Sequence, residues 1–359
     1  MSIQRIAILG TVGVPANYGG FETLVENLVQ YHSNENIPCD LTVYCSSKSY
    51  VEKKDRYLSA KLKYVPLNAN GAQSIIYDWF SLLLAMWRAD VILLLGVSGA
   101  TMLLLVRLLS SARIVTNIDG IEWRREKWKG LAKWILKVSE KMAVRFSHEV
   151  IADNQAIADY VKETYGMDAH VIAYGGDHAV AVEGAPVDEY ALPEKYAFSV
   201  CRIEPENNVH MIVEAFSEQE DLPLVLVGNW KSSDYGQQLQ EQYAKIGHIY
   251  LLDPIYDLGK LYTFRSQAKV YVHGHSAGGT NPSLVEAMLF GKPILAFDCD
   301  FNRFTTEDKA LYFQTENEIM TLLADMSYAE QKKVGEDMLE IARRRYTWDI
   351  VAQQYFSLL

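Results

Sequence analysis

Short apolar runs alternate with longer amphipathic segments along the whole chain, which predicts strands alternating with helices. Residues 91–95 are apolar throughout, as expected of a strand buried on both faces of a sheet. Further strands are expected at residues 5–9, 41–45, 62–65, 113–118, 149–152, 170–173, 196–200, 223–227, 249–252, 270–273 and 294–297. Helices are expected near residues 74–87, 101–109, 130–146 and 154–165. The alternation predicts an α/β fold with doubly wound parallel sheets.

The alternation is interrupted over about residues 179–194, where glycine, proline and acidic residues follow no periodic pattern. A chain of 359 residues is long enough for two domains, each with its own core. We therefore predict a first domain over residues 1–178, a linker over 179–194 and a second domain over 195–345.

Composition and charge favour a large globular protein of the cytoplasm. The hydrophobic fraction is 49%, and the net charge of −11 excludes a general nucleic-acid binder. The four cysteines form no CxxC pair or metal-binding spacing, as expected in a reducing compartment. No signal peptide is visible, because the first residues run directly into a strand. The most apolar stretch, residues 91–106, is shorter than the roughly 20 residues of a membrane span, and we interpret it as a strand, a turn and a core helix.

The segment 273–293 carries the strongest functional signal. A predicted strand is followed by a glycine-rich turn and then by a helix that Asn281 can cap, with Pro282 at its first position. Unpaired backbone N–H groups at such a helix start favour an anion. Glu286 lies one turn further on, within reach of a sugar or ribose hydroxyl pair. The alternative is an ordinary strand–turn–helix with a surface glutamate.

Two positions in the first half also follow predicted strands. The loop after residues 5–9 lacks the GxGxxG spacing, and the next strand ends without an acidic residue, so a dinucleotide oxidoreductase is excluded. Asp119 follows the strand 113–118, at the edge where parallel sheets bind ligands. Glu122 and Trp123 add a polar and stacking surface suited to sugars. The alternative at Asp119 is a plain Asp-Gly turn.

The segment from Gly279 to Glu286 resembles the donor-binding segment of the family-four retaining glycosyltransferases, which have the GT-B fold. The resemblance implies two Rossmann-like domains facing a cleft, with the final helix, about residues 346–359, returning to the first domain. It places the nucleotide-sugar donor against Gly19, Gly20, Arg202, Asn207, His275, Gly279, Thr280, Asn281, Ser283 and Glu286, and the acceptor against Tyr18, Asp119, Glu122 and Trp123. Two positions depart from the family pattern: Asn207 stands where a lysine is usual, and Gly278 where the first of two glutamates is usual.

The Gly-Gly-Thr-Asn-Pro-Ser variant resembles a subgroup with bacterial β-1,4-rhamnosyltransferases of cell-surface polysaccharide synthesis. This implies transfer of L-rhamnose from deoxythymidine diphosphate-rhamnose (dTDP-rhamnose) to a polyprenyl-diphosphate-linked saccharide, with retention and without a metal or other cofactor. Asp119 and Arg202 are then the catalytic residues, and Arg202 stabilises the departing diphosphate. A non-catalytic nucleotide-sugar-binding subunit and a GT-B-type sugar-nucleotide epimerase remain as alternatives.

Two further patterns resemble metal-binding motifs, but neither favours a metal site. Asp298-Cys-Asp300 is formally the D-x-D of metal-dependent glycosyltransferases, but its position after a strand favours a structural role. His273 and His275 lack the third ligand of a catalytic zinc site. We expect His275 to hydrogen-bond the donor, with a structural role as the alternative.

A basic stripe predicts contact with an anionic membrane surface. Residues 121–145 contain eight basic residues against three acids, and Lys129, Lys133, Lys137 and Lys141 recur every four positions. Trp134 and other apolar residues occupy another face of the same helix, as in interfacial helices. We therefore expect the protein to lie on the inner face of the plasma membrane. The alternative is a solvated helix whose apolar side packs into the domain.

Overall fold

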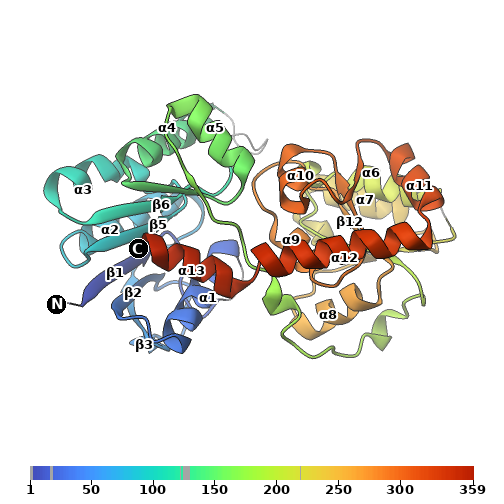
Figure 1. Ribbon diagram of the computed structural model, residues 1–359, viewed down its shortest axis with the longest axis horizontal. Coiled ribbons are helices and arrows are strands. Elements are labelled where there is room, and N and C mark those ends of the chain that lie inside the picture. The colour runs from blue at the N-terminus through green and yellow to red at the C-terminus, as the bar shows by residue number, and fades with distance from the viewer. Residues whose placement is uncertain (1–2, 17–18, 122, 124–129, 219) are drawn as a thin grey trace. The chain divides into compact units, whose positions relative to one another are not determined.

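The computed structural model describes residues 3–16, 19–121, 123, 130–218 and 220–359. The chain forms two compact units, Met1–Ala173 with Trp348–Leu359, and Tyr174–Thr347 (Figure 1). The segment expected to be a linker, 179–194, belongs to the second unit. One short 3-10 turn, Asp177–Ala179, ends at its first residue, and another, Asp188–Tyr190, lies within it.

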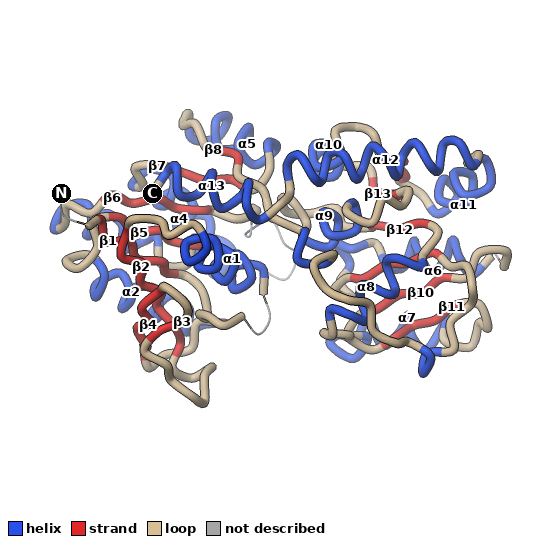
Figure 2. The backbone as a smooth tube through the Cα atoms, turned by 60° about the horizontal axis from the view of Figure 1, so that its bottom comes forward, coloured by secondary structure: helices blue, strands red, loops and turns tan. Residues whose placement is uncertain are grey.

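The first unit is built on an eight-stranded sheet in the order β3-β4-β2-β1-β5-β6-β7-β8 (Figure 2). Every pairing is parallel except that of β3 with β4. The strands are β1 (Gln4–Leu9), β2 (Cys39–Ser46), β3 (Arg56–Tyr57), β4 (Ala60–Val65), β5 (Val91–Leu95), β6 (Arg113–Asn117), β7 (Glu149–Ala152) and β8 (His170–Val171). The central β5 is buried at every position, because helices cover both faces of a parallel sheet.

The helices of the first unit are α1 (Gly20–Asn34), α2 (Ser74–Ala85), α3 (Leu103–Leu109), α4 (Gly130–Phe146), α5 (Gln155–Tyr165) and α13 (Trp348–Leu358). Local signals fix the ends of α5: the side chain of Asn154 accepts a hydrogen bond from the Ala156 amide, and Gly166 ends the helix in a left-handed conformation. The last helix, α13, packs against α1, where Phe356 stacks on Tyr31.

The second unit has a six-stranded, fully parallel sheet in the order β11-β10-β9-β12-β13-β14. Its strands are β9 (Ala197–Val200), β10 (Leu224–Val227), β11 (Ile249–Leu252), β12 (Val270–His273), β13 (Ile294–Phe297) and β14 (Leu311–Phe313). Its helices are α6 (Val209–Ser217), α7 (Asp234–Tyr243), α8 (Leu258–Gln267), α9 (Pro282–Met288), α10 (Asp300–Thr306), α11 (Glu316–Asp325) and α12 (Tyr328–Arg345). Complete capping boxes at Thr315 and Ser327 start α11 and α12.

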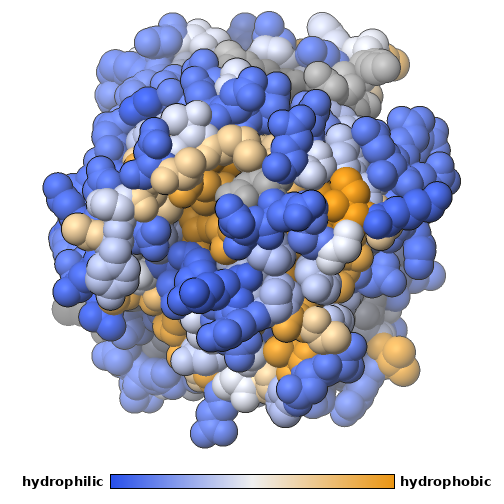
Figure 3. Space-filling view, turned by 90° about the vertical axis from the view of Figure 1, so that its right-hand side faces the viewer, coloured by the Kyte–Doolittle hydropathy of each residue, from blue (hydrophilic) through white to orange (hydrophobic). Residues whose placement is uncertain are grey.

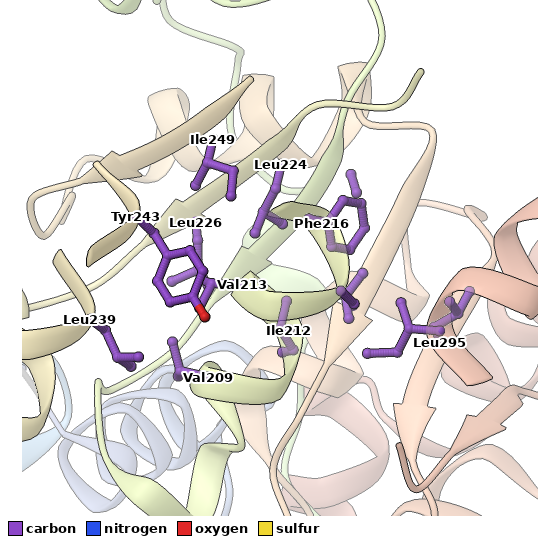
Figure 4. Close-up of a cluster of buried hydrophobic side chains, with 14 of the residues drawn as sticks. Val209, Ile212, Val213, Phe216, Leu224, Leu226, Leu239, Tyr243, Ile249 and Leu295 are labelled. Carbon is purple, nitrogen blue, oxygen red and sulfur yellow. The ribbon is translucent and has the colours of Figure 1, made fainter. Parts of the chain in front are cut away.

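The core of the second unit lies between its sheet and the helices α6, α7 and α11 (Figure 4). Phe216 of α6 and Leu224 and Leu226 of β10 are fully buried in it. Burial of each such side chain stabilises the unit by about 1.5–3 kcal/mol. The side of the molecule seen in Figure 3 is mostly hydrophilic with smaller apolar areas, as is usual for protein surfaces.

One helix of the first unit departs from its prediction. The segment 101–109 was expected to be a core helix, but only Leu103 and Val106 of α3 are buried. Four leucines of the same helix are exposed, by 39% to 73%: Leu104, Leu105, Leu108 and Leu109. Apolar content therefore predicted the helix correctly and its burial wrongly. Among the described residues, none of the helices is both long and apolar enough to cross a membrane.

Candidate functional site

In the second unit, the order of the strands determines where ligands can bind. The first strand, β9, lies between β10 and β12, so the chain direction across the sheet reverses between β9 and β12. Open parallel sheets bind ligands beyond the carboxyl ends of their strands at such a reversal. Arg202 follows β9, and Gly274 and His275 follow β12. The structure therefore brings two predicted donor residues, Arg202 and His275, to adjacent strand ends.

Arg202 is the exposed cation at this edge. Its side chain is 46% exposed and lies 3.7 Å from Glu204, a loose ion pair that holds it weakly. A guanidinium in this state can turn to bind a phosphate through two parallel hydrogen bonds.

Asn207 was expected to face the donor, but its amide is buried and hydrogen-bonded within the protein. It is 3% exposed, its Nδ2 donates to the Arg202 carbonyl at 2.7 Å, and its Oδ1 lies 2.7 Å from His275 Nδ1. Both ends of the amide are therefore engaged within the protein. Asn207 joins the strand end carrying Arg202 to the one carrying His275.

Glu286 lies inside the unit, in a network of charges. Its Oε2 accepts a hydrogen bond from Arg265 Nη2, and its Oε1 lies 3.2 Å from His178 Nε2. The side chain of Arg265 is only 3% exposed and that of Glu286 16%. The alternative of an ordinary surface glutamate is therefore wrong. The second lone pair on each carboxylate oxygen can still accept a hydroxyl.

Electrostatics keep this carboxylate ionised. Burial raises the pKa of Glu286, but the charge of Arg265 and the hydrogen bond and charge of His178 outweigh it and leave the pKa lowered. His273, beside the site, behaves in the opposite sense. Burial first, and the neighbouring His275 second, lower the pKa of His273 well below the usual histidine value. His273 is therefore neutral at physiological pH.

The turn before α9 has the predicted local structure. Asn281 Oδ1 accepts from the Ser283 amide at 3.0 Å and from the Ser283 hydroxyl at 2.8 Å, which confirms Asn281 as the cap. Thr280 is buried, Gly279 is half-buried, and Gly278 has φ +114°, a conformation that favours glycine. The helix itself spans only Pro282–Met288. Its two turns limit the contribution of a helix dipole.

In the first unit, the loop after β1 is organised by Glu22. Its Oε1 accepts hydrogen bonds from Thr11 Oγ1 at 3.0 Å and from the Val12 amide at 2.7 Å. Gly19 has φ +133°, and a Cβ there would lie 1.9 Å from Glu22 Oε2. The structure thus gives Gly19 a packing role within the loop, and Gly20 begins α1. Tyr18 lies outside the described residues.

Asp119 lies at the carboxyl end of β6, as predicted. It has φ +58°, and its amide donates to Asn117 Oδ1 at 2.8 Å. Asn117 in turn donates to the hydroxyl of Tyr355 from α13, at 2.5 Å. A left-handed aspartate held in this way stands at the ligand-binding edge of the sheet, and strain of this kind clusters at functional sites.

Trp123 contacts lysines of α4. The Nζ atoms of Lys133 and Lys137 lie 5.6 Å and 4.9 Å from the centre of its ring, within cation–π range. This ring face, expected to stack on an acceptor sugar, is thus shared with two of the predicted membrane-facing lysines. Glu122 and Lys129 lie outside the described residues.

Comparison with known proteins finds a different family model similar to each half of the chain. Residues 3–177 match a family model described as "Domain of unknown function (DUF1972)", and residues 188–343 match one described as "Glycosyl transferases group 1". Each of the two models covers less than half of the chain.

Two curated relatives are named as glycosyltransferases. A phosphatidyl-myo-inositol mannosyltransferase of Mycobacterium tuberculosis is 28% identical over 231 residues, which cover 59% of this chain and 60% of the relative. An uncharacterized glycosyltransferase of Methanocaldococcus jannaschii is 27% identical over 177 residues, 45% of this chain and 43% of the relative. The matched region thus spans about 60% of the length of the mycobacterial relative.

Solved structures establish the fold over the whole chain. A sucrose-phosphate synthase from Thermosynechococcus elongatus superposes with a TM-score of 0.78 at 17% identity, covering 99% of this chain and 98% of that one. The Anabaena protein HepE, solved in complex with UDP-glucose, gives 0.70 at 17% identity, covering 99% and 100%. With two parallel α/β sheets, these likenesses confirm the predicted GT-B fold.

The first aspartate of the D-x-D pattern forms an ion pair within the second unit, and the structural role of the pattern stays a prediction. Arg303 donates to both carboxylate oxygens of Asp298, at 2.5 Å and 2.8 Å. These hydrogen bonds are the main cause of the lowered pKa of Asp298. Asp300 begins α10. In the part of the chain that the structure describes, no group of three or more His, Cys, Asp or Glu residues could hold a metal ion.

Sequence reasoning missed Arg265 and His178, the two partners of Glu286 in the second unit. A signal for Arg265 exists: it shares the buried face of α8 with Leu261 and Phe264, at helical spacing. An arginine at a core position requires a buried counter-charge. His178 directly follows Gly175-Gly176-Asp177. Gly176 packs so closely on α9 that a Cβ there would lie 2.9 Å from the Glu286 amide nitrogen.

Proposed function

We propose that the protein is a nucleotide-sugar-dependent glycosyltransferase whose second unit binds the donor. One observation carries the proposal: Arg202, His275 and the largely buried Glu286 follow the adjacent strands β9 and β12, in the segment that matches the group 1 glycosyltransferase model. A phosphate-binding cation beside carboxylate and imidazole acceptors is suited to a diphosphate carrying a sugar. HepE, which shares the fold, was solved with UDP-glucose.

In this proposal Arg202 moves from Glu204 to the diphosphate and stabilises the charge that develops as the sugar–phosphate bond breaks. Glu286 accepts hydroxyls of the donor while Arg265 and His178 keep it ionised and fixed. The departing diphosphate removes the proton of the acceptor hydroxyl, and the sugar keeps its anomeric configuration. Asp119, in the first unit, orients the acceptor.

The donor that we propose is dTDP-rhamnose, on the resemblance of the turn before α9 to rhamnosyltransferases. The test is a thermal-stabilisation screen of dTDP-, UDP- and GDP-sugars, followed by turnover with and without saccharide acceptors. Stabilisation by a UDP- or GDP-sugar alone would overturn the rhamnose assignment. Donor binding without turnover would indicate a non-catalytic subunit, and turnover without acceptor an epimerase.

The proposed acceptor is a polyprenyl-diphosphate-linked saccharide, reached from the inner surface of the plasma membrane. A mycobacterial relative is named as a phosphatidyl-myo-inositol mannosyltransferase. Apolar side chains support such docking, since ten of the seventeen large hydrophobic side chains exposed among the described residues belong to α2, α3, α4 or their ends. They are Ile76, Trp79, Phe80, Trp87, Leu104, Leu105, Leu108, Leu109, Leu131 and Trp134.

The three helices are linked by contacts, and α4 carries exposed lysines. α3 packs against α4, and Trp79 Nε1 of α2 donates to Thr101 Oγ1 at the start of the α3 region, at 2.9 Å. Lys133, Lys137 and Lys141 are exposed on α4. Apolar rings and leucines beside lysines are typical of a surface that enters the headgroup region of an anionic leaflet.

Liposome co-sedimentation tests this docking. We expect binding to anionic vesicles that weakens with salt, and loss of binding when Lys133, Lys137 and Lys141 are changed together to Glu, since each cation contributes about 1 kcal/mol. The matched control changes three exposed lysines of the second unit, Lys231, Lys245 and Lys333, to Glu. Equal losses in both variants, or binding that ignores lipid charge, would contradict the proposal.

A further inference from the structure

The loop that joins β2 to β3 carries a group of cations that the proposed mechanism does not use. It follows Ser46, the last residue of β2, and therefore lies at the carboxyl edge of the first sheet, like Asp119. Open parallel sheets bind ligands at this edge. The Ser46 amide donates to the Val12 carbonyl at 2.8 Å, which places the start of the loop beside the loop after β1.

Two tyrosines hold the backbone of this loop against the sheet. The Tyr50 hydroxyl donates to the Pro15 carbonyl at 3.0 Å, and the Tyr50 ring packs edge-on against Tyr64, with 6.2 Å between the ring centres. The Tyr64 hydroxyl accepts a hydrogen bond from the Lys54 amide at 3.1 Å. The loop therefore presents its charged side chains from an anchored backbone.

The cations of this loop are exposed and unpaired within the described part of the chain. Over residues 47–56, four basic residues stand against the two acids Glu52 and Asp55, in a chain whose net charge is −11. The four exposed basic residues are Lys48, Lys53, Lys54 and Arg56. None of their side chains forms an ion pair with another described residue.

Exposure alone does not explain why these cations lack partners. Other cations of the first unit have side chains that are 41–55% exposed, and each has a carboxylate oxygen within 3.0 Å. They are Arg5, Lys61, Arg113 and Lys162. An unpaired group of cations at the ligand-binding edge is suited to an anionic ligand.

A nearby carboxylate of α1 is already engaged elsewhere. Glu26 accepts hydrogen bonds from the Tyr57 hydroxyl at 2.7 Å and from the Ala16 amide at 3.3 Å. Tyr57 directly follows Arg56, so Glu26 comes close to the basic segment without pairing with it. The positive charge of the loop is therefore left for a ligand.

We propose that Lys48, Lys53 and Lys54 bind the diphosphate that links the acceptor saccharide to its carrier lipid. The inference rests on the proposed function and identifies the part of the first unit that holds the charged portion of the acceptor. Lysine ammonium groups bind phosphate oxygens as point charges, and their flexible stems allow three of them to reach one diphosphate. Asp119, at the same edge, then orients the saccharide.

The place of the loop favours this ligand over the phosphates of membrane lipids. The proposed membrane-docking surface combines lysines with many exposed apolar side chains on α2, α3 and α4. In the segment 47–56, all of which the structure describes, Val51 is the one exposed large hydrophobic side chain. The loop thus has the charge of a phosphate site without the apolar area of a membrane-inserting surface.

Calorimetry on the full chain tests the loop. The probes are geranyl diphosphate and geranyl phosphate, with saturating UDP present to occupy the donor site. We expect wild type to bind the diphosphate about tenfold more tightly than the monophosphate. The loop variant, in which Lys48, Lys53 and Lys54 are changed together to Gln, should lose about tenfold in affinity for the diphosphate, because each exposed charge contact contributes modestly. Added salt should weaken wild type more than the loop variant.

Two control variants separate charge from disturbance of the fold. Val51→Ser changes the same loop at a fully exposed position without altering its charge. Lys245, Lys332 and Lys333 changed together to Gln remove three exposed cations from the second unit. Both controls should bind geranyl diphosphate like wild type, and all variants should keep the wild-type Tm.

Co-sedimentation with phosphatidylglycerol vesicles distinguishes the two sources of phosphate. The loop variant should bind these vesicles like wild type. If it loses vesicle binding as much as it loses geranyl diphosphate, the loop recognises lipid headgroups and the inference is overturned.

The outcomes also separate this inference from the proposed function. If UDP does not bind wild type, the proposed donor site is wrong, whereas the geranyl probes still test the loop. If UDP binds, and geranyl diphosphate binds the loop variant as well as wild type or binds neither, the donor site stands and the role of the loop is overturned.

Discussion

The ion pair between Glu286 and Arg265 should stabilise the second unit as well as serve the donor site. We expect Glu286→Gln to destabilise this unit even without a ligand. The substitution keeps the size of the side chain and removes its charge. Arg265, 3% exposed, then remains as a buried cation that has lost its counter-charge.

The magnitude follows from the burial of the pair. Removing one partner of a buried pair costs about 3–5 kcal/mol, and the glutamine carbonyl can still accept one hydrogen bond, so we expect about 3 kcal/mol. For a unit of this size, 1 kcal/mol corresponds to about 2–4 °C, which predicts a fall in Tm of about 6–12 °C. Glu204→Gln is the control, because Glu204 and Arg202 are 33% and 46% exposed and should contribute less than about 1 kcal/mol.

The assay is calorimetric unfolding of Glu286→Gln, Arg265→Gln and the double variant. We expect the double variant to be more stable than the sum of the single losses predicts, by about 2 kcal/mol. The folded pKa of Glu286 is lowered, so its contribution is present above the ordinary carboxyl pKa and is lost as pH falls through the folded value. Wild type and Glu286→Gln should therefore converge in acid. Additive losses, or a gap that persists at low pH, would refute the reasoning.

Three further predictions concern single positions. His273 is neutral in the folded protein, whereas in the unfolded chain it binds a proton below its usual pKa of about 6.5. The free energy of unfolding should therefore fall toward pH 5 by up to about 1.4 kcal/mol per pH unit. His273→Phe should flatten this slope in urea unfolding, and an unchanged slope would contradict the prediction. Asp119→Asn should reduce sugar transfer sharply while calorimetry finds donor affinity near wild type; a parallel loss of affinity would show that Asp119 serves the donor. Gly10→Ala should lower the stability of the first unit by more than about 3 kcal/mol, because at φ +83° a Cβ would lie 2.0 Å from the Leu95 carbonyl oxygen. Gly166→Ala should lower it by about 1 kcal/mol, because Gly166 has φ +69° but open space around it. Equal melting temperatures of these two variants would count against the steric argument.

The parallel sheets could be predicted because their strands are buried on both faces. Residues 91–95, 149–152 and 270–273 were expected as strands and form β5, β7 and β12 with the same bounds. Short edge strands such as β3 and β14 have two and three residues, too few to show a period. The exposed leucines of α3 show the other limit. Apolar content predicts that a side chain avoids water but not which neighbour covers it.

The candidate site was predicted where its signals are local. The Asn281 cap and the place of Asp119 follow from neighbours in the sequence, and both are as expected. The partner of Glu286 lies 21 residues away on another helix, a distance that no turn or cap encodes. Asn207 was expected to face the donor, because its position relative to Arg202 is visible in the sequence. Whether its amide turns outward or inward depends on packing, and the structure turns it inward.

The two departures from the family pattern, Asn207 and Gly278, belong together with His275. A lysine at 207 would bury a charge and lose the hydrogen bonds to Arg202 and His275. A glutamate at 278 would have to adopt φ +114° with its Cβ 3.3 Å from His275 Nε2. Restoring either residue alone therefore disrupts the arrangement that replaces it. The three positions are coupled, because Asn207 hydrogen-bonds the His275 ring and Gly278 approaches the same ring closely.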